Sequence, residues 1–259
     1  MPRFAANLSM LFTEWTFLDR FAAAAGAGFE AVEFLFPYDH APEEIAARLQ
    51  RNGLQLVNFN LPSGDWNAGE RGFASLVGRR AEFRASVDTA LAYARATGVK
   101  RLHAMAGIAS PDDSIAATCY LENLRYAATR LAEWDIDLLI EPLNPRDMPG
   151  YFLNDFNRAA RIIEKLGLKN VKLQFDIYHR QILHGDVTRG LATLMPIIGH
   201  MQIASVPSRH EPDGEELNFQ HLCEEIDRLG YAGHIGCEYR PRAGTLAGLG
   251  WFTSFAEAA

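Results

Sequence analysis

The stretch Asp137-Leu138-Leu139-Ile140-Glu141-Pro142-Leu143-Asn144 is a short apolar run that stands between two longer segments of helical pattern. An apolar run without alternation is typical of a strand that is buried on both faces of a parallel sheet. Such short runs occur eight times along the chain. They predict strands over residues 4–9, 31–36, 55–60, 99–106, 137–144, 171–178, 198–205 and 234–240.

Segments with apolar residues three or four positions apart separate these strands, and this spacing predicts helices. The predicted helices include residues 81–97, 114–134, 154–166, 188–194 and 217–229. Eight strand-then-helix units in 259 residues favour an α/β fold, a closed (β/α)8 TIM barrel, over an open sheet. No Pro/Ser-rich linker divides the chain, so we expect residues 1–259 to form a single domain.

Composition argues against several function classes. The formal net charge is -7, from 32 acidic and 25 basic residues without a Lys/Arg cluster, so nucleic acid is not an expected partner. No apolar run is long enough to cross a membrane, and the N-terminus lacks the pattern of a secretion signal. The three cysteines are far apart, as expected for reduced, buried thiols in a cytoplasmic protein.

The predicted strands of the C-terminal half end in polar residues. Glu141, Asp176 and Glu238 stand in apolar surroundings, and Gln202 lies in the seventh strand. In a TIM barrel these strand ends surround one mouth, where three carboxylates repel one another unless a positive partner is present. A divalent metal, Mg²⁺ or Mn²⁺, would remove this repulsion, and the Gln202 amide offers a neutral fourth oxygen. The alternative is that each acid pairs with its own arginine.

Further polar side chains near these strand ends are candidates for substrate contacts. His179 and His210 follow the sixth and seventh strands, and Arg240 and Arg242 follow the eighth. An arginine can hold a substrate carboxylate through two parallel hydrogen bonds. The alternatives are ion pairs at the rim of the barrel and, for residues 209–216, a solvated loop.

The N-terminal half is less informative. Glu33 interrupts an otherwise apolar strand, and His103 lies within the fourth strand. The glycine-rich loop 61–72 carries Trp66 beside Arg71. It either closes over a small ligand and excludes water, or it is a plain surface excursion.

Five segments give the chain an end-to-end resemblance to a known group of enzymes. The segments are Pro2-Arg3-Phe4-Ala5-Ala6-Asn7-Leu8-Ser9-Met10, Ala31-Val32-Glu33-Phe34-Leu35-Phe36-Pro37-Tyr38, Arg209-His210-Glu211-Pro212, Gly236-Cys237-Glu238-Tyr239 and Gly248-Leu249-Gly250-Trp251-Phe252. They resemble segments of bacterial hydroxypyruvate isomerases and of the related 2-oxo-tetronate isomerases. These enzymes belong to the xylose-isomerase-like TIM barrels, which also include ketose 3-epimerases and a class of abasic-site endonucleases.

The resemblance implies that Glu141 and Glu238 are the two acid/base carboxylates. The ligands that it implies for a divalent metal, Mg²⁺ or Mn²⁺, are Glu141, Asp176, Gln202 and Glu238. Gln202 stands where ketose 3-epimerases carry a histidine ligand, which leaves the need for the metal open. The implied reaction moves a carbonyl by one position in a small 2-oxo-3-hydroxy acid, through an enediolate. The arginines available for the carboxylate of this anionic substrate are Arg71, Arg209, Arg240 and Arg242.

The expected reaction is the interconversion of hydroxypyruvate and tartronate semialdehyde (2-hydroxy-3-oxopropanoate). A 2-oxo-tetronate isomerase is the first alternative, and a ketose 3-epimerase is the second, with Gln202 in place of histidine counting against it. A metal-dependent nuclease would want further histidine ligands and a basic surface, which this acidic chain does not offer. A non-catalytic sugar-binding barrel is the last alternative, and the presence of both Glu141 and Glu238 argues against it. A homo-oligomer is compatible with the sequence, although no feature demands one.

Overall fold

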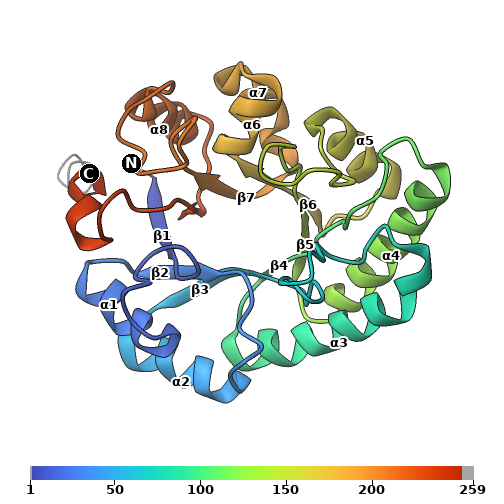
Figure 1. Cartoon of the computed structure of the whole chain (residues 1–259), viewed down its shortest axis with the longest axis horizontal. Coiled ribbons are helices and arrows are strands. Elements are labelled where there is room, and N and C mark those ends of the chain that lie inside the picture. The colour runs from blue at the N-terminus through green and yellow to red at the C-terminus, as the bar shows by residue number, and fades with distance from the viewer. Residues whose placement is uncertain (1, 253–259) are drawn as a thin grey trace.

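Eight parallel strands close into a barrel in the computed structural model, which describes residues 2–252 (Figure 1). Each strand pairs in parallel with its sequence neighbours, and β1 pairs with β8 to close the ring. The strands are β1 (Arg3–Asn7), β2 (Ala31–Phe34), β3 (Gln55–Asn60), β4 (Arg101–His103), β5 (Asp137–Ile140), β6 (Val171–Asp176), β7 (Ile198–Ile203) and β8 (His234–Cys237). The predicted TIM barrel is confirmed. The predicted domain, 1–259, also includes residues 1 and 253–259, which lie outside the described residues.

Helices surround the barrel on its outer side (Figure 1). The α-helices are α1 (Arg20–Gly26), α2 (Pro42–Asn52), α3 (Arg80–Thr97), α4 (Ser114–Ala132), α5 (Phe156–Leu166), α6 (Ile177–His184), α7 (Val187–Leu194) and α8 (Phe219–Arg228). Short 3-10 turns are η1 (Phe17–Asp19), η2 (Val77–Arg79), η3 (Met195–Ile197) and η4 (Leu246–Gly248). The five predicted helices are present, with ends that differ by at most two residues, and side-chain caps start three of them. Asp113, for example, accepts hydrogen bonds from the first backbone N–H groups of α4.

Several strands are shorter than predicted, and the reasons are local. The fifth strand ends at Ile140, two residues before Pro142, which has no N–H to continue the ladder. The sixth strand ends at Asp176, because its carboxylate accepts the N–H of Tyr178 at 2.8 Å and starts α6. The carboxyl ends of the strands therefore turn directly into the loops and helices that hold the polar side chains.

The inside of the barrel changes from apolar to polar along the strand direction. A small apolar cluster inside it consists of Ala5, Ala31 and Val57. Two residues further along their strands, Asn7 and Glu33 point the same way, because side chains alternate along a strand. Gly236 of β8 leaves the space for Glu33, since a Cβ at Gly236 would lie 2.3 Å from both carboxylate oxygens.

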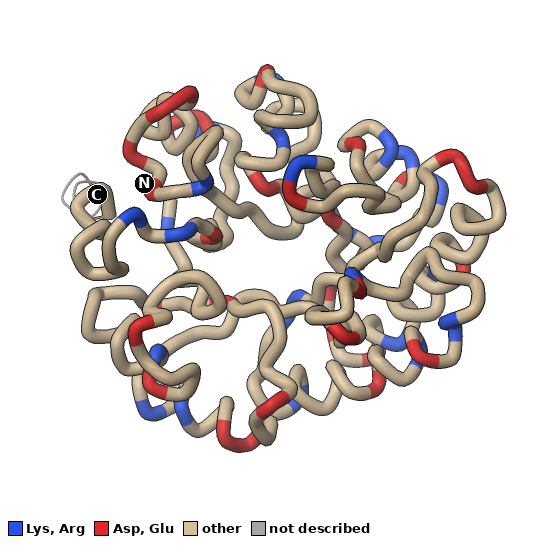
Figure 2. Tube along the Cα trace, in the orientation of Figure 1, with Lys and Arg blue, Asp and Glu red and all other residues tan. Residues whose placement is uncertain are grey.

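The main apolar core lies between the barrel and its helices, and aromatic side chains such as Phe156 and Phe175 pack there at 5.2 Å between ring centroids. Acidic and basic residues are interspersed around the outer helices (Figure 2). Cys119, Cys223 and Cys237 are buried, free thiols, as expected. Among residues 2–252, no helix has the length and apolar character that crossing a bilayer requires.

Candidate active site

Three of the predicted carboxylates meet at the carboxyl ends of the barrel strands. Glu141 follows β5, Asp176 is the last residue of β6, and Glu238 follows β8. All three are buried, with at most 6% of each residue exposed. A cavity of about 250 Å³ opens beside them. It is lined by Met10, Leu35, Asn60, Trp66, Arg71, His103, Met105, Glu141, Leu143, Asp147, Met148, His179, Arg209, Glu238 and Arg240.

Arg209 supplies the positive charge between these acids. It lies in the loop after β7 with a φ of 56°, and its side chain is only 9% exposed. Its guanidinium is 3.4 Å from Glu238 Oε2 and 3.8 Å from Asp176 Oδ2. It also donates a hydrogen bond to Asp147 at 3.0 Å. A single arginine is thus shared by several carboxylates, which differs from the alternative in which each acid has its own.

The environment raises the pKa of the carboxyl groups of Glu141, Asp176 and Glu238. Burial raises the pKa of Glu238 to about 8, against the opposing effect of the Arg209 charge. Burial likewise raises the pKa of Asp176 to about 6. The pKa of Glu141 lies well above its usual value of 4.5, because of burial first and then of the Glu238 and Asp176 charges. Carboxyls that titrate near neutrality can both remove and return a proton, as acid/base catalysis requires.

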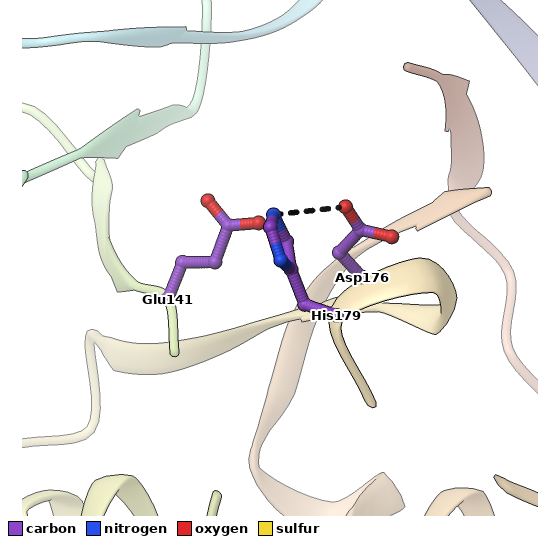
Figure 3. Close-up of side chains that lie close together, drawn as sticks. All are labelled: Glu141, Asp176 and His179. Carbon is purple, nitrogen blue, oxygen red and sulfur yellow. Dashed lines mark ion pairs between the residues drawn. The ribbon is translucent and has the colours of Figure 1, made fainter. Parts of the chain in front are cut away.

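His179 lies beside these acids, in the first turn of α6. Its Nε2 atom is 3.6 Å from Asp176 Oδ2, and burial lowers the pKa of the imidazole well below its usual value of 6.5. Figure 3 shows His179 between Glu141 and Asp176, with a dashed line from its ring to Asp176. The imidazole is therefore neutral and can exchange hydrogen bonds with a ligand.

Two carboxylate oxygens in this cluster fit a bound cation. Glu141 Oε1 and Asp176 Oδ2 are buried and have no hydrogen-bond partner. Glu141, Asp176 and His179 can offer ligand atoms that lie within 4.8 Å of one another. Buried carboxylate oxygens without a hydrogen-bond donor are ligands that Mg²⁺ and Mn²⁺ prefer. The two carboxylate oxygens thus suit a divalent cation.

Gln202 belongs to a hydrogen-bonded chain beneath the cavity. Its Oε1 accepts a hydrogen bond from Gln174 at 2.7 Å, and its Nε2 donates to Glu33 at 2.8 Å. Gln174 also donates to Glu141 Oε2 at 2.9 Å, so the chain runs from Glu33 to a predicted acid/base residue. His200 completes it by pairing with Glu33 Oε2 at 2.5 Å. The role of Gln202 as a metal ligand stays a prediction.

The remaining predicted substrate contacts are divided between the cavity and its rim. Arg71 and Arg240 line the cavity, and the Arg71 guanidinium stacks 3.9 Å from the ring of Trp66. His210 is instead turned to the backbone oxygen of Arg240, at 2.6 Å. Arg242 forms an ion pair at the rim, 2.8 Å from Asp213. The structure thus brings Arg71 and Arg240 into the cavity and leaves His210 and Arg242 outside its lining.

Sequence reasoning did not single out three residues that shape this site. Asp147 lies in an irregular loop, where no periodic signal marks it. Gln174 had such a signal, because it stands two positions before Asp176 and shares its face of β6. Asn144 is the last residue of the predicted fifth strand, 137–144. Its side-chain amide contacts His179.

Comparison with known proteins places this site in a family. The model of the xylose isomerase-like TIM barrels matches residues 21–255. The chain belongs to that family. A 2-oxo-tetronate isomerase of Cupriavidus necator is 57% identical over 98% of this chain and 99% of its own length. A hydroxypyruvate isomerase of Escherichia coli is 46% identical over 98% of this chain and all of its own length.

Solved structures share the barrel fold of this chain. A crystal structure described as an AP endonuclease, family 2, from Brucella melitensis superimposes with a TM-score of 0.97 at 50% identity, covering 98% of this chain and 99% of that one. A D-psicose 3-epimerase from Clostridium cellulolyticum shares the fold, with a TM-score of 0.73 at 17% identity over 95% of this chain and 88% of its own. The expected resemblance and the expectation of an isomerase-family enzyme are confirmed by the full-length relatives.

Proposed function

We propose that this protein interconverts a small 2-oxo-3-hydroxy acid and the isomer in which the carbonyl has moved by one carbon. The observation that carries the proposal is the pair of buried carboxyls, Glu141 and Glu238, with raised pKa values beside one small cavity. Hydroxypyruvate is the substrate that the sequence favours. The 57% identical relative named 2-oxo-tetronate isomerase favours the four-carbon acid instead, and we place that acid first.

Glutamates and arginines of the site have different roles in the proposed reaction. Either Glu141 or Glu238 removes the proton from the hydroxyl-bearing carbon, and the same or the opposite carboxyl returns one to the neighbouring carbon. The hydroxyl hydrogen passes to the former carbonyl oxygen, so that the hydroxyl and the carbonyl exchange places. Arg209, 3.4 Å from Glu238, stabilises the negative charge that develops on the substrate oxygens. Arg71 and Arg240, at the cavity wall, are placed to hold the substrate carboxylate.

The metal is the second part of the proposal. The unpartnered oxygens of Glu141 and Asp176 would hold it, with Glu238 and Gln202 as the other ligands that the resemblance implies. When bound, Mg²⁺ or Mn²⁺ supplies Lewis-acid stabilisation of developing oxygen charge.

Proton NMR in heavy water tests the proposal directly. The protein would be offered 2-oxo-tetronate and, separately, hydroxypyruvate, each with Mg²⁺, Mn²⁺ or excess EDTA. We expect conversion of one acid with deuterium entering the new carbon–hydrogen position, and loss of turnover in E141Q and E238Q, which keep shape and cannot transfer the proton. Turnover of neither acid, or unchanged turnover in both variants, would contradict the proposal. Cleavage of DNA at an abasic site would support the activity in the name of the Brucella melitensis structure instead.

A further inference from the structure

The side chain of Asn144 makes an unusual set of contacts with His179. The Asn144 Nδ2 atom is 2.8 Å from Nδ1 of His179, and the backbone N–H of Asn144 donates to the same Nδ1 at 3.1 Å. Both residues are buried, with at most 1% exposed. The imidazole Nδ1 therefore faces two nitrogen atoms and no acceptor in this contact.

The orientation of the Asn144 amide is fixed by the loop that follows it. Asn144 Oδ1 accepts hydrogen bonds from the backbone N–H groups of Arg146 and Asp147, each at 3.0 Å. Exchanging the amide oxygen and nitrogen would bring an NH₂ group against two N–H donors. The group that faces His179 is consequently the NH₂ donor.

The hydrogen on His179 follows from this arrangement. A ring nitrogen that accepts hydrogen bonds from N–H groups cannot carry a hydrogen itself, so the neutral imidazole carries it on Nε2. The Nε2 atom is the one that lies 3.6 Å from Asp176 Oδ2, on the side of the acidic cluster (Figure 3).

We propose that Asn144 is a positioning residue that holds His179 in the Nε2–H tautomer, so that the imidazole presents a hydrogen-bond donor to the reacting substrate. A nitrogen that carries a hydrogen has no lone pair for a metal, so His179 Nε2 acts toward substrate oxygen rather than as a cation ligand. The catalytic part of this inference rests on the proposed function, whereas the tautomer is a property of the protein alone.

The first test measures the tautomer in the wild-type protein. Two-bond ¹H–¹⁵N correlation spectra of protein labelled at histidine separate a hydrogen-bearing nitrogen from a bare one, and H179Q identifies the His179 signals by their loss. We expect a bare Nδ1 and a hydrogen on Nε2 of His179. A hydrogen on Nδ1 of the wild-type protein overturns the proposal, whatever the protein does with any substrate.

The second test changes the donor at Asn144. In N144D the carboxylate can keep the acceptor that the Arg146 and Asp147 N–H groups need, but it places an acceptor against Nδ1. We expect the hydrogen of His179 to move to Nδ1. N144S, which keeps an acceptor for the turn and loses the amide NH₂ group that faces Nδ1, should weaken the Nε2–H form. An unchanged Nε2–H signal in either folded variant overturns the role of the Asn144 side chain.

A matched control is N123D, because Asn123 is an equally buried amide that contacts Ala74 and Cys119 and no histidine. It should leave the His179 spectrum unchanged. With the substrate identified by the isomerase assay, N144D should lower kcat/KM at least about tenfold. If the tautomer moves as expected and no acid is turned over by the wild type, the proposed function fails and the tautomer assignment stands. An unaltered kcat/KM with a moved tautomer would remove the catalytic part of the inference.

Discussion

Arg209 and Glu238 face each other at 3.4 Å although both side chains are buried. They come from the loop after β7 and from the residue that follows β8, so the parallel pairing of these two strands brings them together. A buried pair of this kind costs desolvation free energy, which its mutual attraction offsets. Asp176 and Asp147 also lie near the same guanidinium, so the acidic cluster depends on Arg209 for its positive charge.

Replacing Arg209 should destabilise the protein strongly. In R209M the carboxylates of Glu238 and Asp176 lose their buried partner, which costs about 3 kcal/mol of unfolding free energy or more above neutral pH. Urea unfolding in EDTA measures this loss. R228M is the control, because Arg228 is exposed and pairs with Glu225 on the surface of α8, and such surface pairs contribute at most about 1 kcal/mol. Equal losses in the two variants would contradict the central role of Arg209.

The titration of Glu238 should make the unfolding free energy depend on pH. Its carboxyl has a pKa of about 8 in the folded protein against an ordinary value of 4.5, so the folded state binds the proton more tightly than the unfolded state. Unfolding free energy should therefore fall as pH rises from about 4.5 to about 8. E238Q removes this titration and should be the more stable protein above pH 8, by about 2 kcal/mol or more.

The comparison is made in EDTA, because a bound cation would favour the charged carboxylate. Below pH 4.5 the two proteins should approach each other in stability, since Glu238 is then protonated in both states. A difference between E238Q and wild type that stays constant across this range would show that Glu238 does not titrate abnormally.

Cation affinity should distinguish Asp176 from Gln202. Asp176 has an unpartnered buried oxygen, whereas the Gln202 oxygen already accepts a hydrogen bond from Gln174. We expect calorimetric titration with Mn²⁺ to show at least about tenfold weaker binding for D176N. Q202M should weaken binding less than D176N. A loss in Q202M as large as in D176N would establish Gln202 as a direct ligand.

Recognition of the substrate carboxylate should depend on Arg71. Its guanidinium lines the cavity while it stacks on Trp66, so R71M should raise KM about tenfold, equivalent to about 1.4 kcal/mol, with a smaller effect on kcat. Steady-state kinetics with the substrate found by NMR measures both constants. R84M is the control, because Arg84 makes a comparable stacking contact with Tyr126 on the outer helices. A KM that rises equally in R84M would argue against a direct contact.

Much of the candidate site can be predicted from the chain alone. Alternating strands and helices of the observed lengths leave few arrangements other than a barrel, because parallel strands need helical crossovers and burial on both faces. Once the barrel is accepted, Glu141, Asp176 and Glu238 must lie around one mouth, since each follows or ends a strand. Gln174 lies two positions before Asp176 on the same face of β6. Strand alternation therefore predicts that Gln174, which donates to Glu141, also points into the site.

Other features were decided only by tertiary structure. Three contacts join side chains from different strand ends and loops. Arg209 is shared among several carboxylates, Gln174 donates to the Gln202 oxygen, and the Asn144 amide donates to His179. Periodicity and capping act within a few residues of the chain, and they fix elements and the faces that side chains occupy. Distances of about 3 Å between elements depend on strand register, loop conformation and side-chain packing throughout the barrel, which no local pattern encodes.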